Sequence, residues 1–427
     1  MVRFGSFRRK TMTRHDPIAA LAAARHEFGE HGGVNMSIET SSTFTVLDPH
    51  TMPDLFSGRL GPDTDRQGCY LYGRHFNPTV YALGRQLAAL EGTEAAYGAA
   101  SGMGAIASVL MQICRAGDHV VASRAIYGGT FALLHDFLPG RAGVSTTFVD
   151  ASDLAAVELA VEPRTKVVFV ETLSNPTLDV ADIPRLAEVA HRHGALLVVD
   201  NTFAPVLVAP SQLGADVVVH SMTKFLSGAS DLIAGAVCGS TDFIRSMMDV
   251  HTGALMLLGP TLDPRVAFEL SVRLPHLGLR MREHSHRAMT FAVRLRELGL
   301  DVRYPGLDEH PQHALMRGML TDEDFGFGGV LGLDIADPEV ANRLLDELQN
   351  RERFGWIAVS LGYFDTLMSV SAASTSSELS DEDLAAAGIR PGYVRISVGF
   401  TGTLEQRWLQ LEHALRRVGL AGARARG

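Results

Sequence analysis

The middle of the chain alternates short apolar runs with helical segments. The runs cover residues 119–123, 146–149, 166–171, 195–200, 216–221 and 232–238. Within them, stretches such as 167–170 are continuously apolar instead of alternating with polar residues. Strands of that kind are buried on both faces, as in a parallel sheet covered by helices. A helix predicted over 183–193 completes a β-α-β unit, and the pattern as a whole predicts an α/β domain over residues 77–270.

The N-terminal part of the chain has a different pattern. Asp16-Pro17 predicts a helix start, because an acidic N-cap and a proline in the first turn favour one, and Gly32-Gly33 predicts its end. Residues 34–76 show little periodicity and many turn formers. We therefore expect residues 1–76 to form one helix and an extended arm.

The C-terminal part mixes strands and helices. A long helical stretch follows Asp263 and leads out of the α/β domain. Beyond it the pattern predicts strands and helices in mixed order, with strands over 329–335, 358–362 and 394–398 and helices over 338–349 and 404–418. Residues 271–427 are therefore expected to form a smaller α+β domain.

Composition narrows the classes of partner. The formal net charge is −10, so we do not expect nucleic acid as a partner, since phosphate binding needs clustered Lys and Arg. No apolar run approaches the roughly 20 residues of a membrane helix, and no membrane partner is expected. The first fifteen residues hold five basic and no acidic residues, which fits a frayed extension or a transit peptide.

Cysteine and histidine spacing gives no sign of a metal site or a disulfide. The three cysteines, Cys69, Cys114 and Cys238, are far apart and form no CxxC or CxxH pattern. A reducing cytoplasm is the predicted compartment. Histidine pairs such as His284 and His286 are spaced by two residues, which on a helix points their side chains apart.

A lysine follows one of the predicted buried strands. Lys224 stands between two hydroxyl residues, Thr223 and Ser227, and a small-residue turn comes next. A lysine in such a place is either salt-bridged or extended towards water, or it is a neutral amine of the kind that Schiff-base chemistry needs. The motif by itself leaves both interpretations open.

An acidic residue and a glycine turn stand at other strand ends. Asp200 ends the predicted strand 195–200, where it either faces water or pairs with a pyridinium nitrogen. The spacing of 24 residues between Asp200 and Lys224 is one strand–connection–strand unit, so both can reach one crevice. Ser101-Gly102-Met103-Gly104 starts a helix whose free N–H groups favour an anion.

These three features, in this order, resemble the Cys/Met-metabolism family of pyridoxal-phosphate (PLP) enzymes. The resemblance runs from about residue 26 to residue 415. It includes five further motifs: Tyr72-Gly73-Arg74, Asn77-Pro78-Thr79, Tyr127-Gly128-Gly129-Thr130, Glu171-Thr172 with Asn175-Pro176, and Arg395-Ile396-Ser397-Val398-Gly399. It implies the PLP-dependent transferase fold of the aspartate aminotransferase type (fold type I), with a mainly parallel central sheet.

Within the family, four stretches are most similar to methionine γ-lyases of the plant type. They are HEFGEHGGVNMSI (26–38), HPQHAL (310–315), SLGYFDTL (360–367) and STSSE (374–378). One position departs from the bacterial methionine γ-lyases, which usually carry cysteine where this chain has Gly129. Plant-type enzymes and cystathionine enzymes also have glycine there, so Gly129 is compatible with lyase activity but does not by itself single out methionine as the preferred substrate.

The resemblance implies roles for the residues around the cofactor ring. Lys224 matches the lysine that bonds to the cofactor, and Asp200 the acid that keeps the ring nitrogen protonated. Tyr127 matches the tyrosine stacked on the ring, and Asn175 the asparagine near the ring hydroxyl.

It also implies a phosphate site and a shared active site. The phosphate cradle corresponds to Gly102, Met103, Ser221 and Thr223. Tyr72 and Arg74 match a pair that reaches the phosphate of a neighbouring subunit, so a homodimer is implied, and a dimer of such dimers is expected.

The implied reaction is γ-elimination on a sulfur amino acid, with methionine giving 2-oxobutanoate, methanethiol and ammonia. Arg395 matches the arginine that binds the substrate carboxylate, Ser360 a residue near it, and Tyr127 the acid that protonates the leaving thiolate. Three alternatives remain open: γ-replacement, as in cystathionine γ-synthases or O-acylhomoserine sulfhydrylases; cystathionine γ- or β-lyase activity; and a γ-lyase for another γ-substituent. A scaffold without activity is disfavoured, because Lys224, Asp200 and Arg395 are all present.

Overall fold

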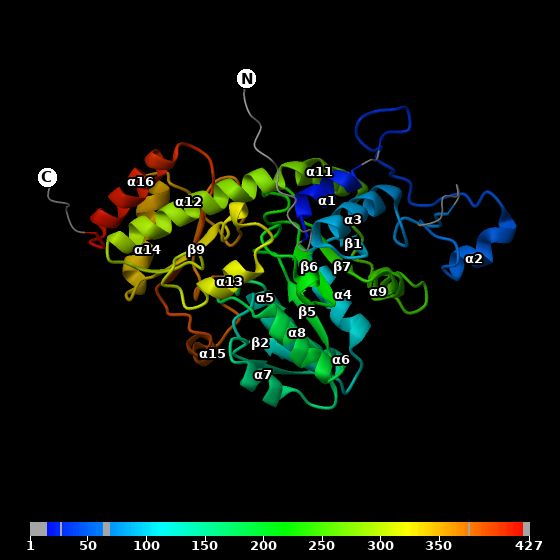
Figure 1. Cartoon of the computed structure of the whole chain (residues 1–427), viewed down its shortest axis with the longest axis horizontal. Helices are drawn as coiled ribbons and strands as arrows, with labels where there is room; N and C mark the ends of the chain where they lie inside the picture. Colours follow the sequence, from blue (N-terminus) through cyan, green and yellow to red (C-terminus); the bar gives the residue numbers. More distant parts are fainter. Residues whose placement is uncertain (1–14, 26–27, 63–68, 375, 422–427) are drawn as a thin grey trace, which may run out of the picture.

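A computed structural model describes residues 15–25, 28–62, 69–374 and 376–421. The basic residues at positions 3–14, the C-terminal residues 422–427, His26 of the stretch 26–38 and Thr375 of the stretch 374–378 lie outside the described residues. The described chain forms two sheets, with the first in the green and cyan half of Figure 1 and the second among the yellow to red elements.

The larger sheet has seven strands in the order β1-β7-β6-β5-β4-β2-β3. The strands are β1 (Ala95–Ala99), β2 (His119–Ser123), β3 (Ser145–Val149), β4 (Thr165–Glu171), β5 (Leu196–Asp200), β6 (Val217–Ser221) and β7 (Gly235–Gly239). Only β7 runs antiparallel to its neighbours. The six predicted strands are confirmed, with β7 starting three residues later than expected. The sequence pattern missed β1, because its segment Ala-Ala-Tyr-Gly-Ala is short and has small side chains.

Helices cover this sheet and deliver side chains to its edge. They are α3 (Pro78–Glu91), α4 (Gly102–Ile113), α5 (Gly128–Ala132), α6 (Leu138–Ala142), α7 (Leu154–Ala160), α8 (Ile183–Arg192), α9 (Thr241–Met247), α10 (Ala254–Leu258) and α11 (Pro264–Arg273). Helix α4 packs on β6 and β7, and α8 packs on β4 and β5. Helix α4 is capped by Ser101, whose side chain accepts a hydrogen bond from Gly104 N. The first turn of α4 lies against the carboxyl end of β6, where Gly102 approaches Ser221.

The N-terminal helix is shorter than the sequence predicted. Helix α1 (Pro17–Ala24) begins at the expected Asp16 cap but ends well before Gly32-Gly33. Arg25 leaves the helical conformation, at φ −92° and ψ 62°, and the last buried side chain of the helix is Leu21. Of the expected arm, the described parts have little regular structure apart from a short 3-10 turn (Pro49–Thr51) and α2 (Met52–Phe56).

The smaller sheet has five strands in the order β10-β11-β12-β9-β8. They are β8 (Asp301–Arg303), β9 (Val330–Asp334), β10 (Trp356–Ile357), β11 (Leu367–Val370) and β12 (Tyr393–Ser397). The helices around it are α12 (Leu277–Glu297), α13 (His313–Met319), α14 (Pro338–Asp346), α15 (Asp381–Ala386) and α16 (Leu404–Arg417). Helix α14 ends at Asp346 and a π-helical turn (Glu347–Arg351) follows, so the predicted helix 338–349 is interrupted.

The predicted strand 358–362 is wrong, because this segment is irregular. Its backbone instead crosses close to the strand-end lysine. Gly362 has a φ of +75°, and a β-carbon there would lie 2.5 Å from Phe225 N, so only glycine fits. The Gly362 N–H donates to Ser397 Oγ on β12 over 2.9 Å, which fixes the segment between the two sheets.

Each sheet has its own buried apolar cluster. One joins α3, α4, α8 and the strands of the larger sheet, and the other joins α12, α14, α16 and the smaller sheet. In the described parts of the chain, no helix combines the length and the apolar character needed to cross a membrane.

Candidate active site

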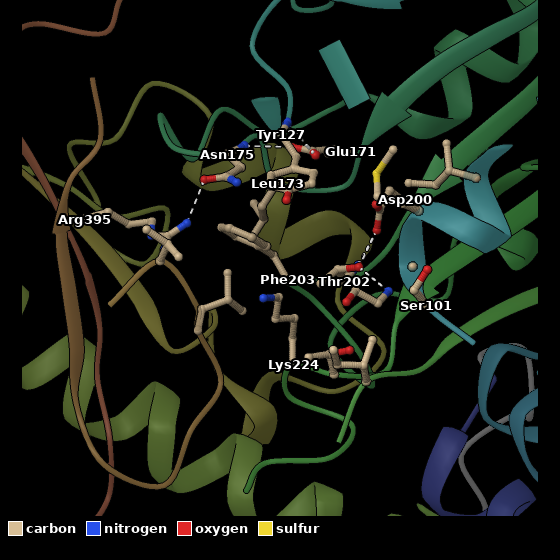
Figure 2. Close-up of a pocket in the computed structure, with 18 residues that line it drawn as sticks. Ser101, Tyr127, Glu171, Leu173, Asn175, Asp200, Thr202, Phe203, Lys224 and Arg395 are labelled. Atoms are coloured by element: carbon tan, nitrogen blue, oxygen red, sulfur yellow. Dashed lines mark hydrogen bonds between the residues drawn. The ribbon is translucent and has the colours of Figure 1, made fainter. Parts of the chain in front are cut away.

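A cavity of about 220 Å³ lies at the carboxyl ends of β4, β5 and β6. This is the edge of a parallel sheet where ligands bind in open α/β folds. Nine of the residues that the sequence singled out line it: Gly102, Met103, Tyr127, Asn175, Asp200, Ser221, Thr223, Lys224 and Arg395. Figure 2 shows Lys224, Asp200, Tyr127 and Arg395 pointing into the same space from different elements.

The Lys224 side chain is a buried amine with an acceptor beside it. Its Nζ donates to Ser360 Oγ over 3.0 Å, so Ser360 adjoins the amine. No carboxylate in the described part of the chain forms an ion pair with it, which rules out the salt-bridged alternative there. Burial, together with the positive charge of Arg395, lowers the pKa of Lys224 to about 8. The amine is therefore available as a nucleophile and base near neutral pH.

Asp200 does not face water, since its exposed fraction is 8%. Its Oδ1 accepts two hydrogen bonds from Thr202, one from the backbone N over 2.9 Å and one from Oγ1 over 2.5 Å. Thr202 Oγ1 in turn accepts from Ser221 N over 2.8 Å. Burial raises the pKa of Asp200 while its hydrogen bonds from Thr202 lower it, and a cation in the cavity would favour the ionised carboxylate further.

The start of α4 is held against the end of β6. A β-carbon on Gly102 would lie 2.8 Å from Ser221 Cβ, so only glycine allows this approach. The first N–H groups of a helix have no partner within the helix, and those of Gly102 and Met103 belong to this first turn. Thr223 Oγ1, beside them, exchanges hydrogen bonds with the backbone of Ala234.

Arg395 is held from two sides on β12. Its Nη1 donates to Asn175 Oδ1 and its Nη2 to the Ser360 carbonyl, both over 3.0 Å. Burial lowers the pKa of Arg395 to about 10, which still leaves a cation at neutral pH. A buried guanidinium between fixed acceptors is suited to a planar carboxylate.

Tyr127 precedes α5 and is half-exposed at the cavity. Burial, and after it the charge of Glu378, raises the pKa of Tyr127, so the phenol stays protonated. A protonated phenol at the wall of the cavity can serve as an acid.

Three predicted residues do not line the cavity of this chain: Ser360 adjoins it through its hydrogen bond with Lys224, whereas Tyr72 and Arg74 lie away from it. Tyr72 is 45% exposed, and the Arg74 guanidinium lies 5.7 Å from the centre of its ring. Arg74 Nη1 donates to the carbonyl of Met256 on α10 over 2.7 Å. This chain alone does not bring the pair to its own Lys224.

The sequence missed the part played by several cavity residues. Glu171 ends β4 directly beside Asp200, and Thr202 carries the bonds to Asp200. Glu171 stands in a quoted motif, and the strand-end rule that selected Asp200 applies to it equally. The apolar cavity residues Leu173, Phe203, Ile233, Val359 and Leu361 have no chemical signal in sequence.

The donor set fits PLP. Lys224 supplies a free amine for the cofactor's carbonyl, and Asp200 a buried carboxylate for a ring cation. The first turn of α4 and the hydroxyl of Ser221 supply hydrogen-bond donors for a phosphate, and Thr223 could add its hydroxyl by giving up its bond to the Ala234 carbonyl. All of these groups line one cavity, which is the arrangement that a single bound cofactor requires.

Comparisons with known proteins agree with this fit. A family model for Cys/Met metabolism PLP-dependent enzymes matches residues 19–406. The chain is 59% identical over 404 residues to a methionine gamma-lyase from Arabidopsis thaliana, covering 94% of this chain and 91% of the relative. It is 38% identical over 389 residues to an O-succinylhomoserine sulfhydrylase from Pseudomonas aeruginosa, covering 90% and 91%.

Solved structures of similar fold point the same way. A putative O-acetylhomoserine (thiol)-lyase from Campylobacter jejuni, which holds a pyridoxyl-lysine phosphate, superposes with a TM-score of 0.85 at 27% identity, covering 94% of this chain and 100% of that one. A cystathionine gamma synthase from Xanthomonas oryzae superposes with a TM-score of 0.82 at 32% identity, covering 93% and 98%. The family match, the mostly parallel sheet and the PLP-suited cavity lead to one conclusion: this chain belongs to the Cys/Met-metabolism family of PLP-dependent enzymes, with fold type I.

Proposed function

We propose that this enzyme catalyses γ-elimination on a sulfur amino acid, converting L-methionine to 2-oxobutanoate, methanethiol and ammonia. One observation carries the proposal. The charged side chains that line the cavity are Glu171, Asp200, Lys224 and Arg395. Glu171 accepts from two backbone N–H groups, and the proposal assigns Asp200 and Lys224 to the cofactor and Arg395 to the substrate carboxylate. The remaining wall includes Ile233, Val359 and Leu361, which suits an apolar thioether better than a second charged amino-acid head.

The 59% identity to a methionine gamma-lyase from Arabidopsis thaliana supports the same substrate. Relatives that bear the names of sulfhydrylases and cystathionine enzymes support γ-replacement as a second candidate. The two reactions share their early proton transfers and differ in whether a second nucleophile is admitted.

In this proposal Arg395 and Ser360 hold the substrate carboxylate, and PLP supplies an electron sink for the bond that is broken. The substrate amine releases Lys224, whose Nζ then takes the α-proton. With a pKa of about 8, roughly a tenth of such an amine is neutral at pH 7. Tyr127, kept protonated by its raised pKa, donates a proton to the departing thiolate.

We also propose a homodimer with shared active sites, two of which form a tetramer. Residues 1–76 would contact the neighbouring subunit, residues 77–270 would hold the cofactor, and residues 271–427 would close the site. The exposed apolar side chains of the arm, among them Phe28, Val34 and Leu47, support burial against another subunit. The low number of cysteines, three in 427 residues, supports a cytoplasmic location.

Subunit mixing tests the shared site. Arg74→Ala and Lys224→Ala homomers should each lose activity. Mixed dimers should regain one working site of two, because that site receives Arg74 from one subunit and Lys224 from the other. Failure of every mixture to regain activity would contradict the shared site.

Product analysis of the cofactor-loaded enzyme tests the reaction. L-methionine, L-cystathionine, L-cysteine and O-acetyl-L-homoserine would be supplied separately, with assays for 2-oxobutanoate, pyruvate and volatile thiol. Strong 2-oxobutanoate and methanethiol from methionine would support the proposal. No turnover of methionine, with 2-oxobutanoate from O-acetylhomoserine that falls when a thiol is added, would establish γ-replacement instead.

A further inference from the structure

The Glu171 carboxylate joins two loops of the active site through their backbones. Its Oε1 accepts a hydrogen bond from Tyr127 N over 2.9 Å, and its Oε2 accepts one from Asn175 N over 2.7 Å. Figure 2 shows Glu171 next to Tyr127 at one wall of the cavity, with Asn175 on the other side of Tyr127. Each carboxylate oxygen therefore has one backbone N–H, and the two loops come from β2 and β4.

Glu171 is in a costly place for a carboxylate. It is 7% exposed, and Asp200 is its direct neighbour across β4 and β5. Burial and Asp200 raise the pKa of Glu171, whereas the two N–H bonds and Arg395 act in the opposite direction. Each of the two carboxylate oxygens accepts one backbone N–H. The site therefore requires a group with two acceptor atoms, and a carboxylate is such a group.

The two residues held by Glu171 have different partners. Tyr127 is the N-cap residue of α5, and its backbone N–H donates to Glu171. The side chain of Asn175 accepts a hydrogen bond from Arg395 Nη1 over 3.0 Å. A continuous path of hydrogen bonds thus runs from the Tyr127 backbone through Glu171 and Asn175 to Arg395.

We propose that Glu171 is a positioning residue that sets Tyr127 and, through Asn175, the substrate-binding Arg395 relative to each other. The inference rests on the proposed roles of Tyr127 and Arg395. It deepens that function because the acid and the carboxylate site then depend on one buried group whose two carboxylate oxygens accept from backbone N–H groups.

The Glu171→Gln variant of the full-length, PLP-loaded enzyme tests this. Glutamine keeps the shape but opposes one N–H with its own NH₂ group, so one of the two loops loses its acceptor. Small displacements of reacting groups cost large factors in rate, and we expect kcat/KM for methionine to fall about 10- to 100-fold. The dissociation constant for glycine, read from the cofactor's visible absorbance, should rise about tenfold because Arg395 is displaced.

Glycine is the probe because it has no γ-substituent to lose, so its binding does not depend on elimination. Glu412→Gln is the matched control, since Glu412 is also 7% exposed but pairs with Arg416 on α16. It should leave the glycine dissociation constant unchanged. In an Asn175→Ala background, Glu171→Gln should weaken glycine binding less than in the wild type, because the path to Arg395 is already broken.

The inference would be overturned, and the proposed function left standing, if Glu171→Gln kept wild-type glycine affinity and turnover. Full additivity of the effects of Glu171→Gln and Asn175→Ala on glycine binding would have the same meaning. A wild-type enzyme that binds neither glycine nor methionine would overturn the proposed function and this inference with it. If Glu171→Gln does not fold, Glu171→Asp decides: its shorter carboxylate reaches only one N–H, so glycine affinity should again fall, and unchanged affinity would overturn the inference.

Discussion

Lys224 Nζ lies 3.0 Å from Ser360 Oγ, although the two residues are 136 positions apart in the chain. Ser360 is in turn held by Arg395, which donates to its carbonyl over 3.0 Å. The Lys224 amine and the Arg395 guanidinium, to which we assign the proton transfer and the binding of the substrate carboxylate, therefore meet at one short segment between the two sheets. The lysine, its hydrogen-bond acceptor and the arginine must be treated as one unit.

Replacing the lysine removes the amine on which the chemistry depends. Lys224→Ala should lose its covalent bond to PLP and at least about 1,000-fold in turnover, since no other lysine of the described residues lines the cavity. Visible absorbance and borohydride trapping of the cofactor on the peptide would check this. Normal turnover in the variant would contradict the assignment of Lys224.

The lowered pKa of Lys224 predicts how the apoenzyme takes up its cofactor. Only the neutral amine attacks a carbonyl, so the rate of reloading with PLP should rise with pH and level off above about 8. Arg395 contributes to that lowering, and Arg395→Met should move the midpoint upwards and slow reloading at pH 7.5. Stopped-flow absorbance measures both profiles. A midpoint in Arg395→Met at or below that of the wild type would contradict the argument.

Replacing Asp200 by asparagine should remove the negative charge at this position and keep its hydrogen bonds from Thr202. Asp200→Asn can still accept the two bonds from Thr202 on its carbonyl oxygen, but it offers no negative charge to the cofactor ring. Turnover should fall about 100-fold or more, and PLP should dissociate faster. Circular dichroism should show the fold retained. Unchanged turnover would mean that the ring nitrogen needs no counter-charge here.

Adding a methyl group at Gly102 should disturb the phosphate site. The new β-carbon would meet Ser221 Cβ at 2.8 Å and Ser221 Cα at 3.0 Å, so α4 must move away from β6. Gly102→Ala should therefore weaken PLP binding at least about tenfold by the loss of placed phosphate contacts. Gly140→Ala is the control, because a β-carbon there meets nothing within 4 Å and alanine favours the helix. Equal PLP affinity in both variants would contradict the assignment of the first turn of α4 to the phosphate site.

Local patterns accounted for most of the larger sheet. Continuous apolar runs identify strands buried on both faces whatever their neighbours are, and Asn77 and Ser101 mark helix starts through the caps their side chains form. For the same reason the pattern failed at β1, whose small residues are buried by the helices around it and not by their own hydrophobicity. It failed at 358–362, where an apolar segment packs against Phe225 without pairing as a strand.

The sequence by itself determined the chemistry available: the lysine, the aspartate and the glycine turn at strand ends, and the family that their order resembles. Only the tertiary structure decided which groups meet. The contact of Glu171 with Tyr127 depends on strand order in the larger sheet, and the contact of Lys224 with Ser360 depends on the packing of the second sheet. These contacts are non-local. They join residues far apart in the chain, and the local pattern of apolar and polar residues does not show which distant residues will meet.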